Sequence, residues 1–117
     1  MLREHATCRS LDPKEATEKI EKGEKYAIRF RSSGDEGTFK FKDLVKGQLE
    51  LPLNTQDIVL LKSDGLPTYH FAHVVDDTLM QVTHVIRGDE WLSSVPIHVE
   101  LFRVLELKTP KFAHILR

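Results

Sequence analysis

The stretch IVLLKSDGLPTYHFAHVVDDTLMQVTHVIRGDEWLSS, residues 58–94, decides the fold. It begins with a continuous apolar run at 58–61, which is typical of a strand covered on both faces. Residues 68–79 have helical spacing, and residues 82–87 form a second strand candidate. Residues 91–107 carry an apolar helical stripe. The order strand, helix, strand, helix predicts an α/β fold with a parallel, right-handed crossover, one end of a doubly wound sheet.

The chain before this stretch has a different sequence pattern, with short amphipathic segments in place of continuous apolar runs. Asp12 and Pro13 are suited to begin a helix, as cap and first-turn residue, and Gly23 ends it. Three short, half-exposed strands are then predicted, at 26–31, 38–41 and 48–51. We therefore expect a small α+β unit over residues 1–57, with a boundary before residue 58.

Composition limits the size and the partners of the protein. With 117 residues, of which 40% are hydrophobic, the chain can bury one modest core. Its formal net charge of −1 gives no overall attraction to nucleic acid, so RNA contact would need a local basic patch. The single cysteine, Cys8, leaves no internal disulfide, and no apolar run reaches membrane-spanning length. These features predict a cytoplasmic protein without membrane contact.

Arg87 is the first candidate for ligand binding. It follows an apolar strand and precedes Gly88, so it should lie at the carboxyl end of that strand, where open α/β sheets hold ligands. Its planar guanidinium suits a carboxylate or a phosphate. From spacing alone, an ion pair with Asp89 or Glu90 is an equal alternative.

Aromatic and imidazole side chains gather on the predicted helix over 68–79. Tyr69 and His73 are four residues apart and should share one helix face. Either they point into a crevice together or they pack at the helix edge with their polar ends in water. His70, His73 and Asp77 have spacing that could ligate zinc, although no further ligand cluster supports such a site. Trp91 could stack on a flat base, but anchoring the last helix is the simpler interpretation.

Basic residues alternate with aromatic ones in the first half of the chain. They could contact phosphates, or they could form solvated strand faces because acidic residues lie among them. The basic residues are Arg29, Arg31, Lys40, Lys42 and Lys46, with Phe39 and Phe41 between them.

Two long motifs carry a family resemblance. LLKSDGLPTYHFAHVVDD (60–77) and THVIRGDEWLSS (83–94) closely resemble bacterial-type glutamyl-tRNA synthetases. Residues 8–11, 26–30, 41–47 and 111–114 resemble the same family, so the resemblance covers essentially the whole chain. It implies part of a class I glutamate–tRNA ligase, which activates glutamate with ATP and Mg and transfers it to tRNA(Glu).

The resemblance also implies roles for single residues. Arg87 would pair with the side-chain carboxylate of glutamate, while Tyr69 and His73 would line the same pocket. Position 73 is commonly Asn in the family, so His73 is a departure. Glu90 and Trp91 would lie beside the adenosine of ATP.

By the same resemblance, residues 1–57 are a tRNA acceptor-binding insertion, and residues 58–117 are the second half of a Rossmann-like catalytic domain. Arg29, Arg31, Lys40 and Lys46 would contact tRNA. Both nucleotide-binding signatures of the family would lie outside residues 1–117, so this chain would hold no catalytic residue and would not aminoacylate alone. Zinc is not expected, because Ser10 stands where a further ligand beside Cys8 would be needed.

Two other functions remain open from the sequence. The chain could be a non-catalytic module that binds the tRNA acceptor stem. It could instead be an interaction fragment that docks, or self-associates, through an unpaired edge of the strand at 58–61. Within the enzyme class, a paralogue that glutamylates a modified tRNA base is disfavoured by the runs at 67–69 and 91–94.

Overall fold

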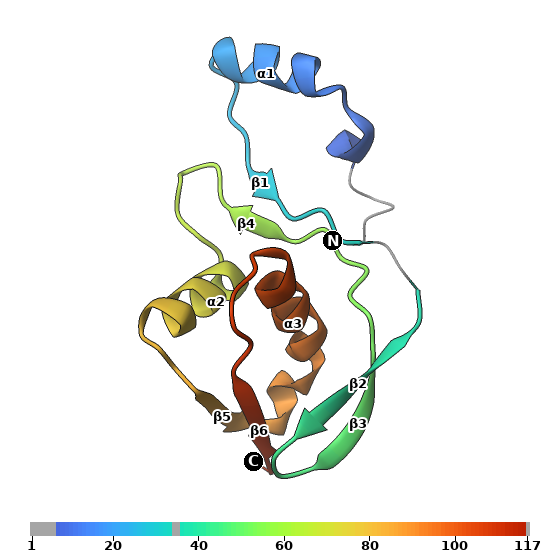
Figure 1. The fold of residues 1–117 in the computed structure, drawn as a ribbon. Helices are drawn as coiled ribbons and strands as arrows, with labels where there is room; N and C mark the ends of the chain where they lie inside the picture. Colours follow the sequence, from blue (N-terminus) through green and yellow to red (C-terminus); the bar gives the residue numbers. More distant parts are fainter. Residues whose placement is uncertain (1–6, 34–35, 117) are drawn as a thin grey trace.

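The computed structural model describes residues 7–33 and 36–116, and over these residues the protein is mixed α/β (Figure 1). The helices are η2 (Thr7–Ser10), α1 (Pro13–Glu21), α2 (Tyr69–Leu79), η3 (Asp89–Ser94) and α3 (Val95–Val104), where η denotes a 3₁₀ helix. The strands are β1 (Ile28–Arg29), β2 (Thr38–Asp43), β3 (Gly47–Pro52), β4 (Val59–Leu61), β5 (His84–Gly88) and β6 (Lys111–Ile115).

The larger sheet has the strand order β3-β2-β6-β5. β2 and β3 form an antiparallel hairpin. β5 and β6 are parallel and are connected through α3, which makes them a β–α–β unit. β2 meets β6 at a single register pair, Asp43 opposite Phe112. The hairpin therefore joins the parallel strands over a very short contact.

The predicted parallel crossover between the strands at 58–61 and 82–87 is wrong. β4 instead pairs antiparallel with β1 in a separate two-stranded sheet, with Ile28 opposite Leu61. After β4 the chain turns back along the strand, where Thr68 N donates to Leu60 O over 2.9 Å and Pro67 pairs with Leu61, so β4 has no side left for a parallel neighbour. The parallel crossover lies one step later, from β5 through α3 to β6.

The unpaired edge predicted on the strand at 58–61 is also wrong. Leu61 pairs with Ile28 of β1 on one side and with Pro67 on the other. Within the described residues, the edge of the parallel part of the sheet is β5, which pairs with β6 alone.

The helix predictions are largely confirmed. Asp12 Oδ1 accepts a hydrogen bond of 2.9 Å from Lys14 N at the start of α1, and Gly23 after its end has φ +82°. The predicted last helix over 91–107 is divided into η3 and α3. Pro96 lies in the first turn of α3, where its missing N–H costs nothing.

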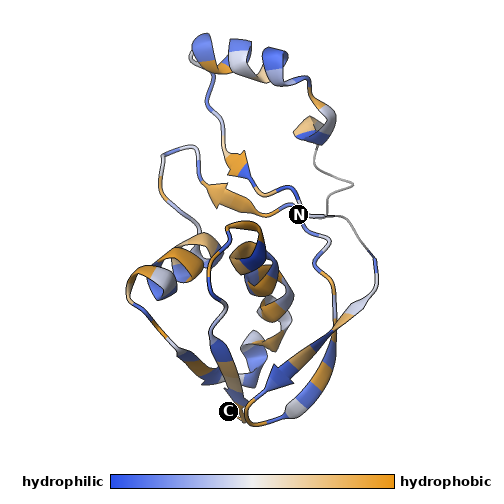
Figure 2. Ribbon diagram, viewed as in Figure 1, coloured by the Kyte–Doolittle hydropathy of each residue, from blue (hydrophilic) through white to orange (hydrophobic). Residues whose placement is uncertain are grey.

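The core lies around α3 and β6. Phe102, Phe112, Leu101, Val74 and Val95 are each at most 1% exposed. Figure 2 shows α3 largely apolar and α1 largely polar, in agreement with the lack of buried residues in α1. Over the described residues, no helix combines the length and the apolar character needed to cross a membrane.

Of two buried carboxylates, Asp57 holds the first half of the chain together and Glu100 ties it to the second half. Asp57 accepts hydrogen bonds from Arg9 Nη1 over 3.2 Å and from Ser32 N over 2.9 Å. Glu100 on α3 accepts one from Asn54 Nδ2 over 2.8 Å. The boundary predicted before residue 58 falls beside this polar contact and stays a prediction.

Candidate functional site

Arg87 lies near the carboxyl end of β5, opposite His114 of the parallel strand β6. Ligands of α/β proteins are commonly held at this end of parallel strands. Histidines of α2 and α3 complete its surroundings. We call this group the Arg87 site; it consists of Arg87, His114, His98, His70, His73 and Tyr69.

The guanidinium of Arg87 is held by two imidazole rings. Its Nε donates to His114 Nε2 over 3.0 Å, and its Nη1 lies 3.3 Å from His98 Nδ1. The guanidinium carbon lies 5.2 Å from the centre of the Phe112 ring, within cation–π range. The ion pairs with Asp89 or Glu90 that the sequence allowed are not the contacts observed for Arg87, and Asp89 pairs with Lys46 over 3.6 Å instead.

The remaining nitrogen, Nη2, is buried and has no hydrogen-bond partner in the described part of the chain. A buried donor without an acceptor is costly, and more so when it carries charge. Nη2 is therefore suited to an acceptor brought by a ligand, above all to an anionic oxygen.

A further set of hydrogen bonds extends from each ring. His98 Nε2 lies 2.8 Å from His70 Nδ1, and His114 Nδ1 lies 2.5 Å from Asp43 Oδ2. His98 and His114 are fully buried. Sequence reasoning did not single out either histidine as a site residue, because a histidine within an apolar stripe is usually an ordinary core residue.

Asp43 is ionised although it is buried. Burial by itself would raise its pKa, but hydrogen bonds from Lys46 N, the His114 ring, Val45 N and His114 N lower the pKa to about 2. The carboxylate thus closes the turn between β2 and β3 and also orients the ring of His114.

The other ionisable groups of the site favour neutral imidazoles. Burial lowers the pKa of His98 to about 2, and the nearby His73 and Arg87 charges act in the same direction. Burial also lowers the pKa of His70 and of His73, the latter against the opposing effect of Asp77. Burial lowers the pKa of Arg87, yet a guanidinium stays protonated in proteins. Arg87 is therefore the cation of the site at pH 7.

Tyr69 and His73 share one face of α2, as predicted. Their rings are stacked, with centroids 5.8 Å apart and planes 11° apart. Trp91 of η3 packs on Tyr69 with centroids 5.2 Å apart, and both rings remain partly exposed. Trp91 therefore connects η3 to α2 and keeps an accessible surface.

The possible zinc ligands do not converge. His73 Nε2 lies 3.2 Å from Asp77 Oδ2, close enough for an ion pair but without hydrogen-bond geometry, and His70 Nδ1 faces His98. Among residues 7–33 and 36–116 there is no group of three or more His, Cys, Asp or Glu side chains placed to hold a metal ion.

Glu90 lies beside the Arg87 site on η3 and is exposed. Its carboxylate folds against Gly88, where a Cβ would come within 2.1 Å of Glu90 Oε2. A side chain at position 88 would thus displace the Glu90 carboxylate from its present position.

The basic residues predicted to contact tRNA are divided between two regions. Arg29 donates to Asp57 O over 3.0 Å, and Arg31 donates to Arg9 O. Lys40 lies on β2 opposite Glu50, and Lys46 lies in the turn of the β2–β3 hairpin. Figure 1 shows β1 well apart from this turn, so the four residues do not form one compact patch.

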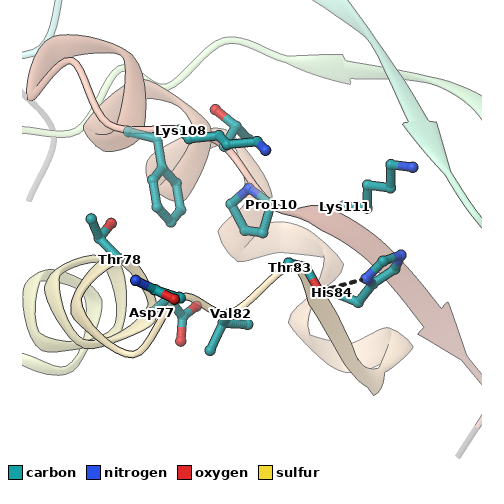
Figure 3. A pocket seen from close by; sticks show the side chains of 11 residues that line it. Asp77, Thr78, Val82, Thr83, His84, Lys108, Pro110 and Lys111 are labelled. Atoms are coloured by element: carbon teal, nitrogen blue, oxygen red, sulfur yellow. Dashed lines mark hydrogen bonds between the residues drawn. The ribbon is translucent and has the colours of Figure 1, made fainter.

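A separate hollow of about 470 Å³ lies between the end of α2 and the segment that leads into β6. Figure 3 shows Asp77 and Thr78 of α2 facing Lys108 and Pro110 across it. It shares Asp77 with the surroundings of the Arg87 site, and no sequence motif pointed to it.

Comparison with known proteins identifies relatives over nearly all of the chain. Residues 1–117 match the family model described as tRNA synthetases class I (E and Q), catalytic domain. Glutamate–tRNA ligases of Clostridium perfringens and Acetivibrio thermocellus are 56% and 53% identical over 96% and 93% of this chain. A solved glutamate tRNA ligase of Elizabethkingia meningosepticum, in complex with its amino acid, is 42% identical with a TM-score of 0.82 over 91% of this chain.

The chain spans about a fifth of the length of these relatives: 21% of the first, 20% of the second and 21% of the solved structure. The resemblance seen in the two sequence motifs is thereby confirmed at the level of the family.

Proposed function

Because the chain belongs to the catalytic-domain family of the class I tRNA synthetases (E and Q), we propose that it is part of a glutamate–tRNA ligase. Such an enzyme activates glutamate with ATP and transfers it to tRNA(Glu). The observation that carries the proposal is the buried Nη2 of Arg87, a charged donor that has no partner in the described part of the chain and lies among neutral rings. A glutamate side chain offers the carboxylate that this nitrogen lacks.

Tyr69 and His73 line the glutamate pocket in this proposal. Their stacked rings stand on α2 beside Arg87, with Tyr69 53% exposed and so able to touch a ligand from the solvent side. His73 brings a ring where the family commonly has an amide. A neutral His73 adds a flat wall to the pocket and no second charge.

ATP, with Mg, is the second substrate in the proposal. Glu90 and Trp91 stand on η3 directly after Arg87 and Gly88, so an adenosine beside them would be adjacent to the bound glutamate. The exposed part of Trp91 offers a face for stacking. Mg would arrive with the ATP phosphates and would help to neutralise their charge.

Contact with tRNA is proposed for residues 1–57, as an acceptor-binding insertion, through Arg29, Arg31, Lys40 and Lys46. The side chains of Arg29 and Arg31 each donate a hydrogen bond to a backbone oxygen, while Lys40 is exposed on its strand. Binding of tRNA would therefore run across two regions of this half. Residues 58–117 would be the second half of a Rossmann-like catalytic domain, in a cytoplasmic enzyme.

The outer edge of β5, which no strand of the described residues covers, is the place where further strands of such a domain would add. Self-association, predicted from the sequence for the strand at 58–61, would in this proposal use the edge of β5 instead, and the apparent mass of the isolated chain would then rise with concentration.

The test is ATP–pyrophosphate exchange with glutamate and tRNA. It is measured on the 117-residue chain alone and on a full-length glutamate–tRNA ligase that carries these residues in place of its own. We expect exchange only in the full-length enzyme. Exchange by the isolated chain would contradict the placement of the nucleotide-binding signatures outside it, and no glutamate-dependent exchange in the full-length enzyme would contradict the proposed substrate.

A further inference from the structure

We propose that His98 and His114 are positioning residues for Arg87: each presents an unprotonated ring nitrogen to the guanidinium, and together they fix the direction of Nη2, which has no partner in the described residues. The inference rests on the proposed function, in which Arg87 binds the glutamate side chain. It assigns a role to two buried histidines that touch no substrate themselves.

The tautomer of His114 follows from its two neighbours. Arginine nitrogens only donate, so His114 Nε2 must accept from Arg87 Nε and carries no proton. Its proton is then on Nδ1, which donates to the ionised Asp43 over 2.5 Å. A doubly protonated His114 would set an N–H against the N–H of Arg87.

The tautomer of His98 follows in the same way but with the nitrogens exchanged. His98 Nδ1 faces Arg87 Nη1 over 3.3 Å and so acts as the acceptor. Its proton is on Nε2, which donates to His70 Nδ1 over 2.8 Å. His70 is thereby left with its own proton on Nε2. The low pKa of His98, due to burial and to the nearby Arg87 cation, supports this neutral form.

The two contacts explain why one part of the guanidinium remains free. A guanidinium has five N–H donors: one on Nε and two on each terminal nitrogen. His114 occupies Nε and His98 engages Nη1, while Nη2 is buried and has no partner in the described residues. Two acceptors at two nitrogens prevent rotation of the planar group, so the direction of Nη2 is set before a ligand arrives.

Replacing the histidines by Asn or Gln distinguishes a positioning role from a purely structural one, because at each position only one of the two amides keeps an acceptor for Arg87. The side-chain amide of Asn reaches the position of His Nδ1, and that of Gln reaches the position of Nε2. His98→Asn and His114→Gln therefore keep an acceptor for Arg87. His98→Gln and His114→Asn lose it, although each keeps a donor for the outer neighbour, His70 or Asp43 respectively.

The variants are made in the full-length ligase that carries this chain, and KM is measured separately for glutamate and for ATP. We expect His98→Gln and His114→Asn to raise KM for glutamate roughly tenfold, as for loss of one hydrogen bond to a charged group. We expect His98→Asn and His114→Gln to stay within roughly threefold of the parent enzyme. KM for ATP should be unchanged in all four variants.

Two controls separate the possible failures. His84→Asn changes an exposed histidine of β5 outside the site and should leave both KM values unchanged. Arg87→Lys should raise KM for glutamate; if it does not, the proposed function is wrong. If Arg87→Lys raises KM but Asn and Gln act alike at positions 98 and 114, the positioning role is wrong and the proposed function stands. Melting temperatures are recorded for every variant, and a rise in KM that follows lost stability alone also overturns the positioning role.

Discussion

Asp43→Asn tests how the β2–β3 hairpin is attached to the parallel strands. Asp43 is 1% exposed and forms the register pair between β2 and β6. One carboxylate oxygen accepts from Val45 N and Lys46 N, each over 2.9 Å, and the other accepts from the ring of His114 over 2.5 Å. Asparagine has the same shape but only one accepting oxygen, so either the turn or His114 loses its partner.

The size of the effect follows from the pKa of Asp43. The pKa is lowered from 3.8 to about 2 in the folded protein, and at about 1.4 kcal/mol per pKa unit this gives about 2 kcal/mol of stabilisation by the ionised form. The folded pKa lies below the unfolded one. The contribution is therefore complete above the unfolded pKa of 3.8 and is lost as the pH falls toward 2.

The assay is urea unfolding of the 117-residue chain, with and without Asp43→Asn, between pH 7 and about pH 2. We expect the variant to be less stable by about 2 kcal/mol at pH 7, and the difference to shrink toward zero in acid. Asp64→Asn is the matched control, because exposed Asp64 also accepts from a turn amide, Leu66 N. A difference at pH 7 no larger than that of the control, or one that is independent of pH, would refute the reasoning.

Three further changes test the site and the core. Arg87→Ala in the full-length ligase should lower kcat/KM for glutamate by an amount equal to about 2–4 kcal/mol of lost transition-state stabilisation, because it removes the charged partner of a carboxylate. Unchanged glutamate kinetics would exclude this role. The low pKa of His98 means that the unfolded chain gains a proton there below its ordinary value of 6.5. Stability should therefore fall as the pH drops from 7 to 5, and His98→Asn should flatten this slope in urea unfolding, whereas a slope equal to the parent's would contradict it. Leu101→Ala empties a fully buried position on α3 and should cost about 2–5 kcal/mol, against less than about 1 kcal/mol for exposed Leu79→Ala in the same measurement.

Local patterns predicted the elements of the fold well, but not the pairing of its strands. The cap at Asp12 and the helical spacing after Thr68 depend on neighbouring residues alone, and α1 and α2 were found close to the expected positions. The pairing of β4 with β1 depends on residues thirty or more positions apart, and period-two alternation does not encode a partner. Pro96 lies in the first turn of α3, whereas the apolar stripe continues back across η3 and conceals the break between the two helices.

The site shows the same division. Arg87, Tyr69 and His73 were singled out as candidates because a strand end and a helix face can be located from spacing, and the structure has them at these places. His98 and His114 were not, since their function depends on an arginine brought beside them from another strand. A buried histidine in an apolar run looks the same in the sequence whether it fills space or accepts a hydrogen bond.

The choice of imidazoles as partners of Arg87 has a direct electrostatic consequence. A carboxylate in contact with the guanidinium would orient it equally well, but its negative charge would oppose the binding of a second carboxylate. Neutral rings orient the guanidinium and leave its charge available to a ligand. The carboxylate of Asp43 acts one ring further away, since its contact with Arg87 is made through His114. Asp43 therefore helps to fix the orientation of Arg87 only through the ring of His114. The same ring lies between the Asp43 carboxylate and the guanidinium, so it increases the distance between the negative charge and the ligand pocket.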